Sequence, residues 1–205
     1  MVLVSLSLRQ QGISLIISLL MTVVVMILSI SGANLVLQNE KASRSDRDRQ
    51  IALMAAEAAL KDAEMDIDSP MPLESQRSHL FDPTSNLYFE PGCAKGDGNI
   101  YQGLCLPSGP GQIPVWLAID LGAENDAPST VKLGRFTGQT MVVGKGVFPA
   151  KLPRYIIEAV QDVEAGQRAD GQTKYIFRIT AIGFGSSETT QVVLQTYYRK
   201  AMKSV

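Results

Sequence analysis

The stretch "RQQGISLIISLLMTVVVMILSIS", Arg9 to Ser31, contains the part of this chain that requires apolar surroundings. After Gly12 an uncharged, mostly apolar run extends from Ile13 to Ala33, and a helix needs roughly 20 such residues to cross the hydrocarbon core of a bilayer. The hydroxyl groups within the run can bond to carbonyls of the same helix. We therefore predict a transmembrane helix over residues 13–33.

An ordinary secretory signal peptide is the alternative reading of this segment. Ser31-Gly32-Ala33 loosely resembles a cleavage site with two small residues. The apolar core is nevertheless longer than the usual run of about 7–15 residues in such peptides. The length favours a helix that stays in the mature protein.

Two features of the sequence predict opposite orientations of this helix in the membrane. Only Arg9 precedes the span, whereas basic residues follow it closely, so the positive-inside rule would place the C-terminal part in the cytoplasm. The two cysteines, Cys93 and Cys105, point the other way. An even pair at short spacing is typical of a disulfide in an oxidising compartment, although two free thiols are also compatible with the sequence.

Length and charge restrict the remaining function classes. The chain has 205 residues, enough for one domain plus an appendage, and its formal net charge is −1. A nearly neutral chain has no overall basic field to attract nucleic acid, so we expect no nucleic-acid partner.

The segment "QIALMAAEAALKDAEMDI", residues 50–67, has the periodicity of an amphipathic helix. Pro70 and Pro72 end it, so we predict one long helix over residues 13–69, with the part at 34–69 amphipathic. A second, shallow face made of Ala52, Ala55 and Ala59 could admit another helix. The apolar stripe, which we expect to pack on a globular domain, consists of Leu53, Ala56, Leu60, Ala63 and Ile67.

Four acidic residues lie near the end of this helix: Asp62, Glu64, Asp66 and Asp68. The helix macrodipole disfavours anions at a C-terminus. We interpret the four carboxylates as a solvated face, with pairing to the cations of a neighbouring protein as the alternative.

The rest of the chain, residues 70–205, is predicted to be a globular domain. Residues 70–111 have the glycine, proline and serine content of irregular structure, and a β-sheet is expected within residues 112–200. Residues 113–120 and 139–144 are the weaker strand predictions, and 153–162, 174–184 and 188–200 are the stronger ones. Short turns join the last three, which predicts an antiparallel meander. The fold class is therefore α+β, with a long N-terminal helix packed on a C-terminal antiparallel sheet.

The sequence offers little for catalysis or for binding a metal or cofactor. His79 is the only histidine, so a site with two histidine ligands is excluded. The segment "KGDGN", Lys95 to Asn99, has oxygen ligands but lacks the later glutamate of a calcium loop, and we interpret it as a turn. We predict no catalytic residues, no metal site and no cofactor, and hence a protein that is not an enzyme.

Several stretches resemble known proteins. "RQQG" followed by "ISLIISLLMTVVV" resembles the leader and first helix of type IV pilins. The resemblance implies a leader over residues 1–12, cleavage by a prepilin peptidase between Gly12 and Ile13, and N-methylation of Ile13. Residues 47–64, 153–158 and 175–199 resemble PilX-type minor pilins, and the helix and terminal strands to which they belong make up roughly half of the chain.

One residue departs from the pilin pattern. Most pilins carry a glutamate at the fifth mature position, where this chain has Ile17. In the family this carboxylate pairs with the terminal amine of a neighbouring subunit. A subunit without it resembles an end subunit, which implies a place in the tip or priming complex; the alternative is a rare subunit interspersed along the pilus, in which selection for the glutamate is relaxed.

The resemblance also implies partners and a location. The partners would be other minor pilins, the major pilin, the prepilin peptidase, the inner-membrane assembly platform and a tip adhesin, in a pilus serving adhesion or twitching motility. The chain would cross the inner membrane once, with its C-terminal domain in the periplasm, and would later enter the pilus. Two alternatives remain: a minor pseudopilin of type II secretion, and a single-pass sensor or binding protein anchored without cleavage.

Overall fold

The computed structural model describes residues 13–69, 75–125, 127–163 and 173–201. The chain forms two compact units that divide between Asp46 and Arg47. Helix α1, Ile13–Ile67, supplies the described part of the first unit and the N-terminal element of the second. Gly12, the predicted cleavage position, lies outside the described residues.

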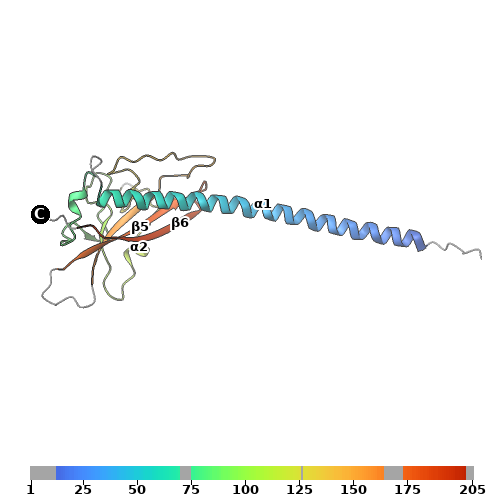
Figure 1. Cartoon of the computed structure of the whole chain (residues 1–205), viewed down its shortest axis with the longest axis horizontal. Coiled ribbons are helices and arrows are strands. Elements are labelled where there is room, and N and C mark those ends of the chain that lie inside the picture. The colour runs from blue at the N-terminus through green and yellow to red at the C-terminus, as the bar shows by residue number, and fades with distance from the viewer. Residues whose placement is uncertain (1–12, 70–74, 126, 164–172, 202–205) are drawn as a thin grey trace, which may run out of the picture. The chain divides into compact units, whose positions relative to one another are not determined.

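The second unit is an α+β domain, as predicted, in which the C-terminal part of α1 lies along a sheet (Figure 1). Its remaining elements, in chain order, are η1 Ser78–Leu80, β1 Glu90–Pro91, β2 Leu104–Leu106, α2 Val115–Ala118, β3 Val131–Lys132, β4 Arg154–Gln161, β5 Tyr175–Phe184 and β6 Gln191–Tyr198.

The predicted antiparallel meander is confirmed as β4, β5 and β6. The register pairs Ile157 with Ile179 and Ile179 in turn with Thr196. The complete sheet is mixed, because short parallel strands extend this antiparallel meander. Its order is β1-β2-β4-β5-β6, with β1–β2 and β2–β4 parallel, while β3 pairs antiparallel with β4. The parallel strands come from the segment expected to be irregular.

The two weaker strand predictions are wrong. Residues 115–118 form the short helix α2, which directly follows Pro114, a residue whose φ of −54° already suits a helical start. Residues 139–144 form no strand. Gly144 and Gly146 both have positive φ and turn this segment back, so that the Gly144 nitrogen donates to the Pro149 carbonyl.

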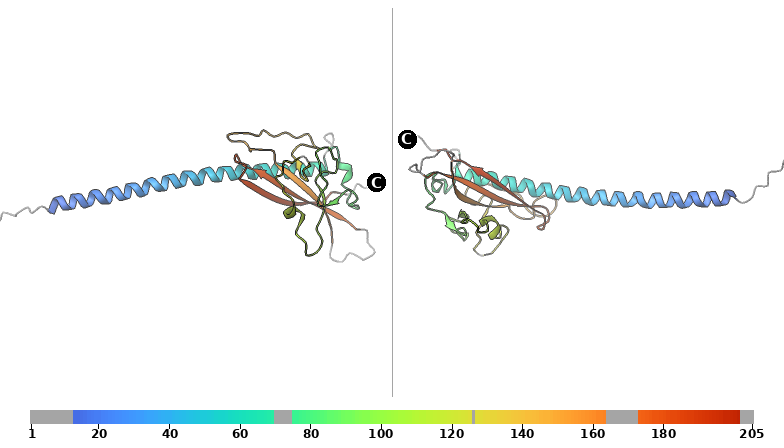
Figure 2. Two further views of the ribbon diagram at one scale, coloured as in Figure 1. Left: turned by 180° about the vertical axis from the view of Figure 1, so that it is seen from behind. Right: turned by 90° about the horizontal axis from the view of Figure 1, so that it is seen from below.

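One face of the sheet is covered by α1, as Figures 1 and 2 show for the part of the helix that belongs to this domain. The contact is close because the helix presents alanines and β5 presents a glycine at the crossing. A Cβ on Gly183 would stand 2.2 Å from the Ala52 carbonyl oxygen, so no larger residue fits there without displacement. Farther along, Ala59, Ala63 and Ile67 join the main core.

The opposite face of the sheet carries a second, smaller core. Alternate residues of β4 and β5, including Ile156 and Ile182, pack there against α2 and the two cysteines. Both faces of the central strands are therefore largely buried, which explains why apolar residues occupy consecutive positions in them, as at Tyr155–Ile157 and Ala181–Ile182. β6 differs, because its residues alternate between exposed and half-buried.

Candidate functional site

The first 18 residues of α1, Ile13–Ile30, are long and apolar enough to cross a membrane. All of their side chains are exposed in the isolated chain, including Ile13 at 61% and Ile17 at 52%. An apolar helix that buries nothing within its own chain requires lipid or other apolar helices around it. This segment is the candidate functional site.

The hydroxyl groups within this segment bond to its own backbone. Ser18 donates to the Leu15 carbonyl at 2.9 Å, Thr22 to the Ser18 carbonyl at 2.6 Å, and Ser29 to the Val25 carbonyl at 2.8 Å. Their polar atoms therefore impose a small cost in lipid or in a helix bundle.

The first charged side chains after the apolar segment lie near the end of the first unit. Glu40 and Arg44 form an exposed ion pair at 2.5 Å, one helical turn apart. No charged residue lies between Ile13 and Asn39 in the sequence.

The predicted helix-packing residues fall into two groups. Ala56, Ala63 and Ile67 are fully buried against the sheet, whereas Leu60 is half-buried and Leu53 remains 37% exposed. The alanine face at Ala52, Ala55 and Ala59, which we expected to admit another helix, is also buried within this chain, where Ala52 lies against Gly183 of β5 and Ala59 lies in the main core.

A buried polar network occupies the end of α1 and was missed by the sequence analysis. Asp66, predicted to be solvated, is fully buried, and Arg77 donates to it from Nε at 2.8 Å and from Nη2 at 2.5 Å. The Tyr155 hydroxyl and the Ser75 hydroxyl donate to the same carboxylate. The Arg77 guanidinium also lies 3.8 Å from the centre of the Phe136 ring.

Asp62 lies one turn earlier and is also buried, so the solvated-face prediction is wrong for both residues. Its carboxylate accepts hydrogen bonds from the Gly134 nitrogen and the Thr137 hydroxyl. Burial raises the pKa of Asp62 despite these bonds. Burial, together with the Asp66 charge, raises the pKa of Tyr155 well above its ordinary value. The network fixes the helix end to the sheet, which makes its role structural.

Cys93 and Cys105 form the disulfide that the sequence analysis favoured. Cys105 lies in β2 and Cys93 follows β1, and both are buried on the face of the sheet opposite α1. The bond closes a short loop and holds the parallel pair β1–β2 at the edge of the sheet.

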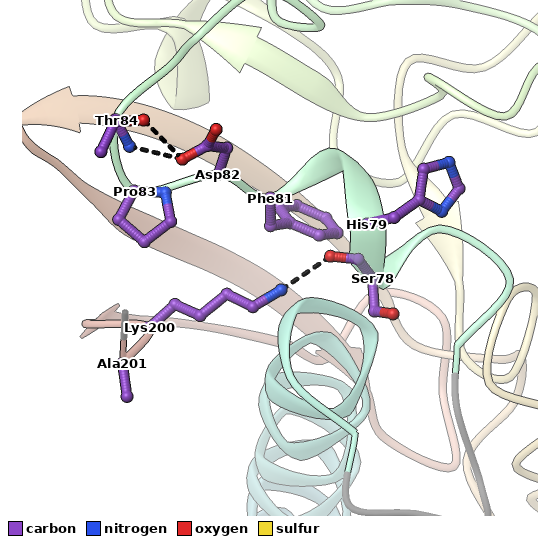
Figure 3. A pocket seen from close by; sticks show the side chains of 8 residues that line it. All are labelled: Ser78, His79, Phe81, Asp82, Pro83, Thr84, Lys200 and Ala201. Atoms are coloured by element: carbon purple, nitrogen blue, oxygen red, sulfur yellow. Dashed lines mark hydrogen bonds between the residues drawn. The ribbon is translucent and has the colours of Figure 1, made fainter. Parts of the chain in front are cut away.

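A cavity of about 400 Å³ lies at the end of the domain where β6 and η1 meet (Figure 3). Lys200 Nζ donates to the Ser78 carbonyl at 2.7 Å, and Asp82 accepts hydrogen bonds from Thr84. The His79 ring lies apart from Asp82 and Lys200. Since these polar groups do not converge on one point, the cavity provides no arrangement for acid–base chemistry.

Potential metal ligands are similarly dispersed. Within the described ranges, no group of three or more His, Cys, Asp or Glu side chains is placed to hold a metal ion. In the segment Lys95–Asn99, the Asp97 carboxylate accepts from the Gln102 amide, and the Asn99 amide donates to the Lys95 carbonyl. These side chains bond within their own part of the domain.

An exposed apolar N-terminal helix that continues into a domain and packs there on an antiparallel meander defines a pilin-like protein. Residues 11–61 match the family described as PilX N-terminal, and residues 101–200 match the family described as type IV pilus assembly protein PilX C-term. The chain belongs to the PilX family of type IV pilus minor pilins. No curated protein and no solved structure matched it.

Both the N-terminal helix and the domain match the same pilus family, so we assign them to one structural protein of the pilus. PilX proteins are structural components of the pilus, and they work with other pilus components. The apolar half of α1 accordingly suits a membrane anchor, and the protein belongs to the pilus.

Proposed function

We propose that this minor pilin occupies an end position in the pilus, within the tip or priming complex that starts polymerisation of the major pilin. The observation that carries the proposal is Ile17, an exposed apolar residue at the place where most pilins have a glutamate. The whole segment from Ile13 to Asn39 has no side-chain charge that could replace it.

The physical argument concerns the terminal amine created by leader cleavage. A single charge inside an apolar bundle is costly, and pairing with an opposite charge reduces that cost. The amine of Ile13 can pair with a glutamate of another subunit. Ile17 cannot neutralise the amine of a subunit on its other side, so an end position, which has no such neighbour, suits this chain.

We further propose that the domain lies in the periplasm and that α1 spans the inner membrane before assembly. The disulfide supports an oxidising compartment. On assembly, residues 13–30 exchange lipid contacts for contacts with the helices of the major pilin and other minor pilins. This exchange can be nearly neutral in free energy, because both surroundings are apolar. The assembly platform and a tip adhesin complete the proposed partners.

Ile17→Glu tests the end position, with Ile16→Glu as the matched control. Both variants place one carboxylate on the same exposed apolar helix, but only Ile17→Glu restores the pilin position. We expect Ile17→Glu to spread along pilus shafts in immunogold electron microscopy, while Ile16→Glu does not. Unchanged subunit placement and pilus number for Ile17→Glu would contradict the proposal.

Gly12→Leu tests the proposed cleavage between Gly12 and Ile13, with Gln11→Leu as the control. A small residue lets a protease approach the backbone closely, so the bulky side chain at Gly12 should leave an uncut precursor. Mass spectrometry of the wild type should find N-methyl-isoleucine at Ile13. A Gly12→Leu variant with the normal mature N-terminus would exclude this cleavage.

A further inference from the structure

β6 is a long free edge of the sheet. It is the last strand in the order β1-β2-β4-β5-β6, and all eight of its residues are in register with β5. Among the described residues, no backbone group pairs with its outer side. Such an edge presents a row of unpaired N–H and C=O groups that another strand can use.

The other two edge strands of the same sheet are protected. β1 is two residues long and consists of Glu90 and Pro91, and β3 is also two residues long and ends with Lys132. Short length, charge and proline are the features by which proteins prevent unwanted strand pairing. The sequence of β6, "QVVLQTYY", contains no charge and no proline. Within one sheet, therefore, two edges are protected and the longest is not.

The hydrogen-bond phase shows which residues of β6 face outward. The Gly185 nitrogen donates to the Thr190 carbonyl at 2.8 Å, so Gly185 and Thr190 form a hydrogen-bonded pair. The next pair in the register, Phe184–Gln191, is therefore a non-bonded pair. Bonded and non-bonded pairs alternate along an antiparallel ladder. The backbone groups of Val192, Leu194, Thr196 and Tyr198 therefore point to β5, and those of Gln191, Val193, Gln195 and Tyr197 point outward.

A second hydrogen bond supports the same phase. At the far end of β5, the Asp162 nitrogen donates to the Lys174 carbonyl at 2.8 Å. Alternation from this bond directs the backbone N–H and C=O groups of Ile176 and Arg178 to β4. The backbone groups of Phe177 and Ile179 therefore point to β6. Both ends of the meander thus assign the same outward-facing groups.

We propose that β6 accepts an extended strand of another pilus subunit, which adds to the sheet by β-augmentation. The outward backbone groups of Val193, Gln195 and Tyr197 supply the hydrogen bonds. Their side chains are exposed, at 48% for Val193 and 55% for Tyr197, and none of the three is charged. The partner strand therefore presents uncharged β-branched, aromatic or amide side chains beside them.

The partner is a different subunit because of the symmetry of the contact. A β6–β6 pair between two copies would be two-fold symmetric and would close as a dimer, whereas a filament grows through heterologous contacts. The inference rests on assembly with other pilus components, which belongs to the family, and it does not require the end position proposed from Ile17.

Amide hydrogen exchange on the full-length chain tests the proposal. The probe is the complex formed by co-expressing this chain with the other minor pilins and the major pilin of its pilus. We expect the amides of Val193, Gln195 and Tyr197 to exchange at least tenfold more slowly in the complex than in the detergent-solubilised chain alone. Equal exchange in both samples would overturn the proposal, as would the same protection appearing in the isolated chain at high concentration, which would indicate a β6–β6 dimer.

Two variants at Val193 test the role of the backbone. Val193→Pro removes one outward N–H without removing a bond to β5, whereas Val193→Thr keeps the N–H and the β-branched shape. We expect Val193→Pro to reduce recovery of the co-expressed complex at least tenfold and Val193→Thr to leave it unchanged. Equal recovery for both variants would overturn the proposal. Should Val193→Pro fail to fold, the exchange experiment on the wild type still decides. If the β6 amides are protected but this chain is found along the pilus shaft, the proposed end position is refuted and the proposed pairing at β6 is retained.

Discussion

Gly183 of β5 lies against the backbone of Ala56 in helix α1, where a Cβ on the glycine would stand 2.3 Å from the Ala56 nitrogen. No ordinary contact is that short, so the absence of a side chain at Gly183 determines how closely the helix lies on the sheet. A Cβ on the nearby Gly185 would stand 2.5 Å from the Asp48 carboxylate and 2.9 Å from the Asp48 carbonyl oxygen. The alanines of α1 and these glycines together form one closely packed crossing.

Gly183→Ala should therefore destabilise the domain. The added methyl group meets helix backbone, which cannot move aside as a flexible side chain can, and overpacking of this kind costs about 3 kcal/mol. Gly98→Ala is the control, since a Cβ there has no atom within 4 Å. Urea denaturation of the detergent-solubilised chain measures both variants. Equal stability of Gly183→Ala and the wild type would show that the crossing is looser than described.

Arg77→Met should be still more damaging, because it leaves the Asp66 carboxylate buried without its cation. Removing one partner of a fully buried ion pair costs about 3–5 kcal/mol. Lys61→Met removes the cation of the exposed pair Lys61–Glu64 and should change stability by less than about 1 kcal/mol. Comparable losses in the two variants would argue against a special role for the buried pair.

The meander was predictable from sequence because its signal is local. Residues 154–161, 175–184 and 191–198 are rich in β-branched and aromatic residues, and two of the three strands are buried on both faces. β1 and β2 were not predictable, since strands of two and three residues exist only through parallel pairing with distant segments. Such pairing leaves no periodic pattern in the chain.

The buried carboxylates were misread for a different reason. Because Asp62 and Asp66 are acidic, we predicted a solvated face, although their positions along the helix indicate a buried one. Ala55, Ala59, Asp62 and Asp66 follow one another at helical spacings of four, three and four, so the two acids continue the buried alanine row. The spacing was visible in the sequence. Their partners Arg77 and Tyr155 were not, because only the fold brings them to this helix end.

Replacing both cysteines should measure the contribution of the disulfide. We expect the double variant Cys93→Ala, Cys105→Ala to lose about 3 kcal/mol, because the unfolded chain regains the freedom of the open loop. Dithiothreitol should lower the stability of the wild type similarly and leave the double variant unchanged. Reduction without loss of stability, with both thiols shown to be alkylated, would exclude this contribution.

Asp48→Asn should change how stability depends on pH. Asp48, on α1, accepts hydrogen bonds from the Ser186 hydroxyl at 2.7 Å and the Ser186 nitrogen at 2.5 Å, in the turn between β5 and β6. The hydrogen bonds from Ser186 and Thr190 lower the pKa of Asp48 in the folded chain. Because the folded pKa is the lower one, the ionised form stabilises the fold.

The sign of the effect follows from this order of pKa values. The stabilisation is fully present above the pKa of the unfolded carboxyl, about 3.9, and is lost as the pH falls through the lower folded value. Because Asp48 is only partly buried and water screens its charge, wild type should exceed Asp48→Asn by at most about 1 kcal/mol at neutral pH, with the difference shrinking below about pH 4. Asp62, whose pKa is raised, and Asp82, whose pKa is lowered, are present in both proteins and cancel in the difference. Urea denaturation between about pH 3 and pH 7 measures this difference, and a constant value across that range would refute the role of the Asp48 charge.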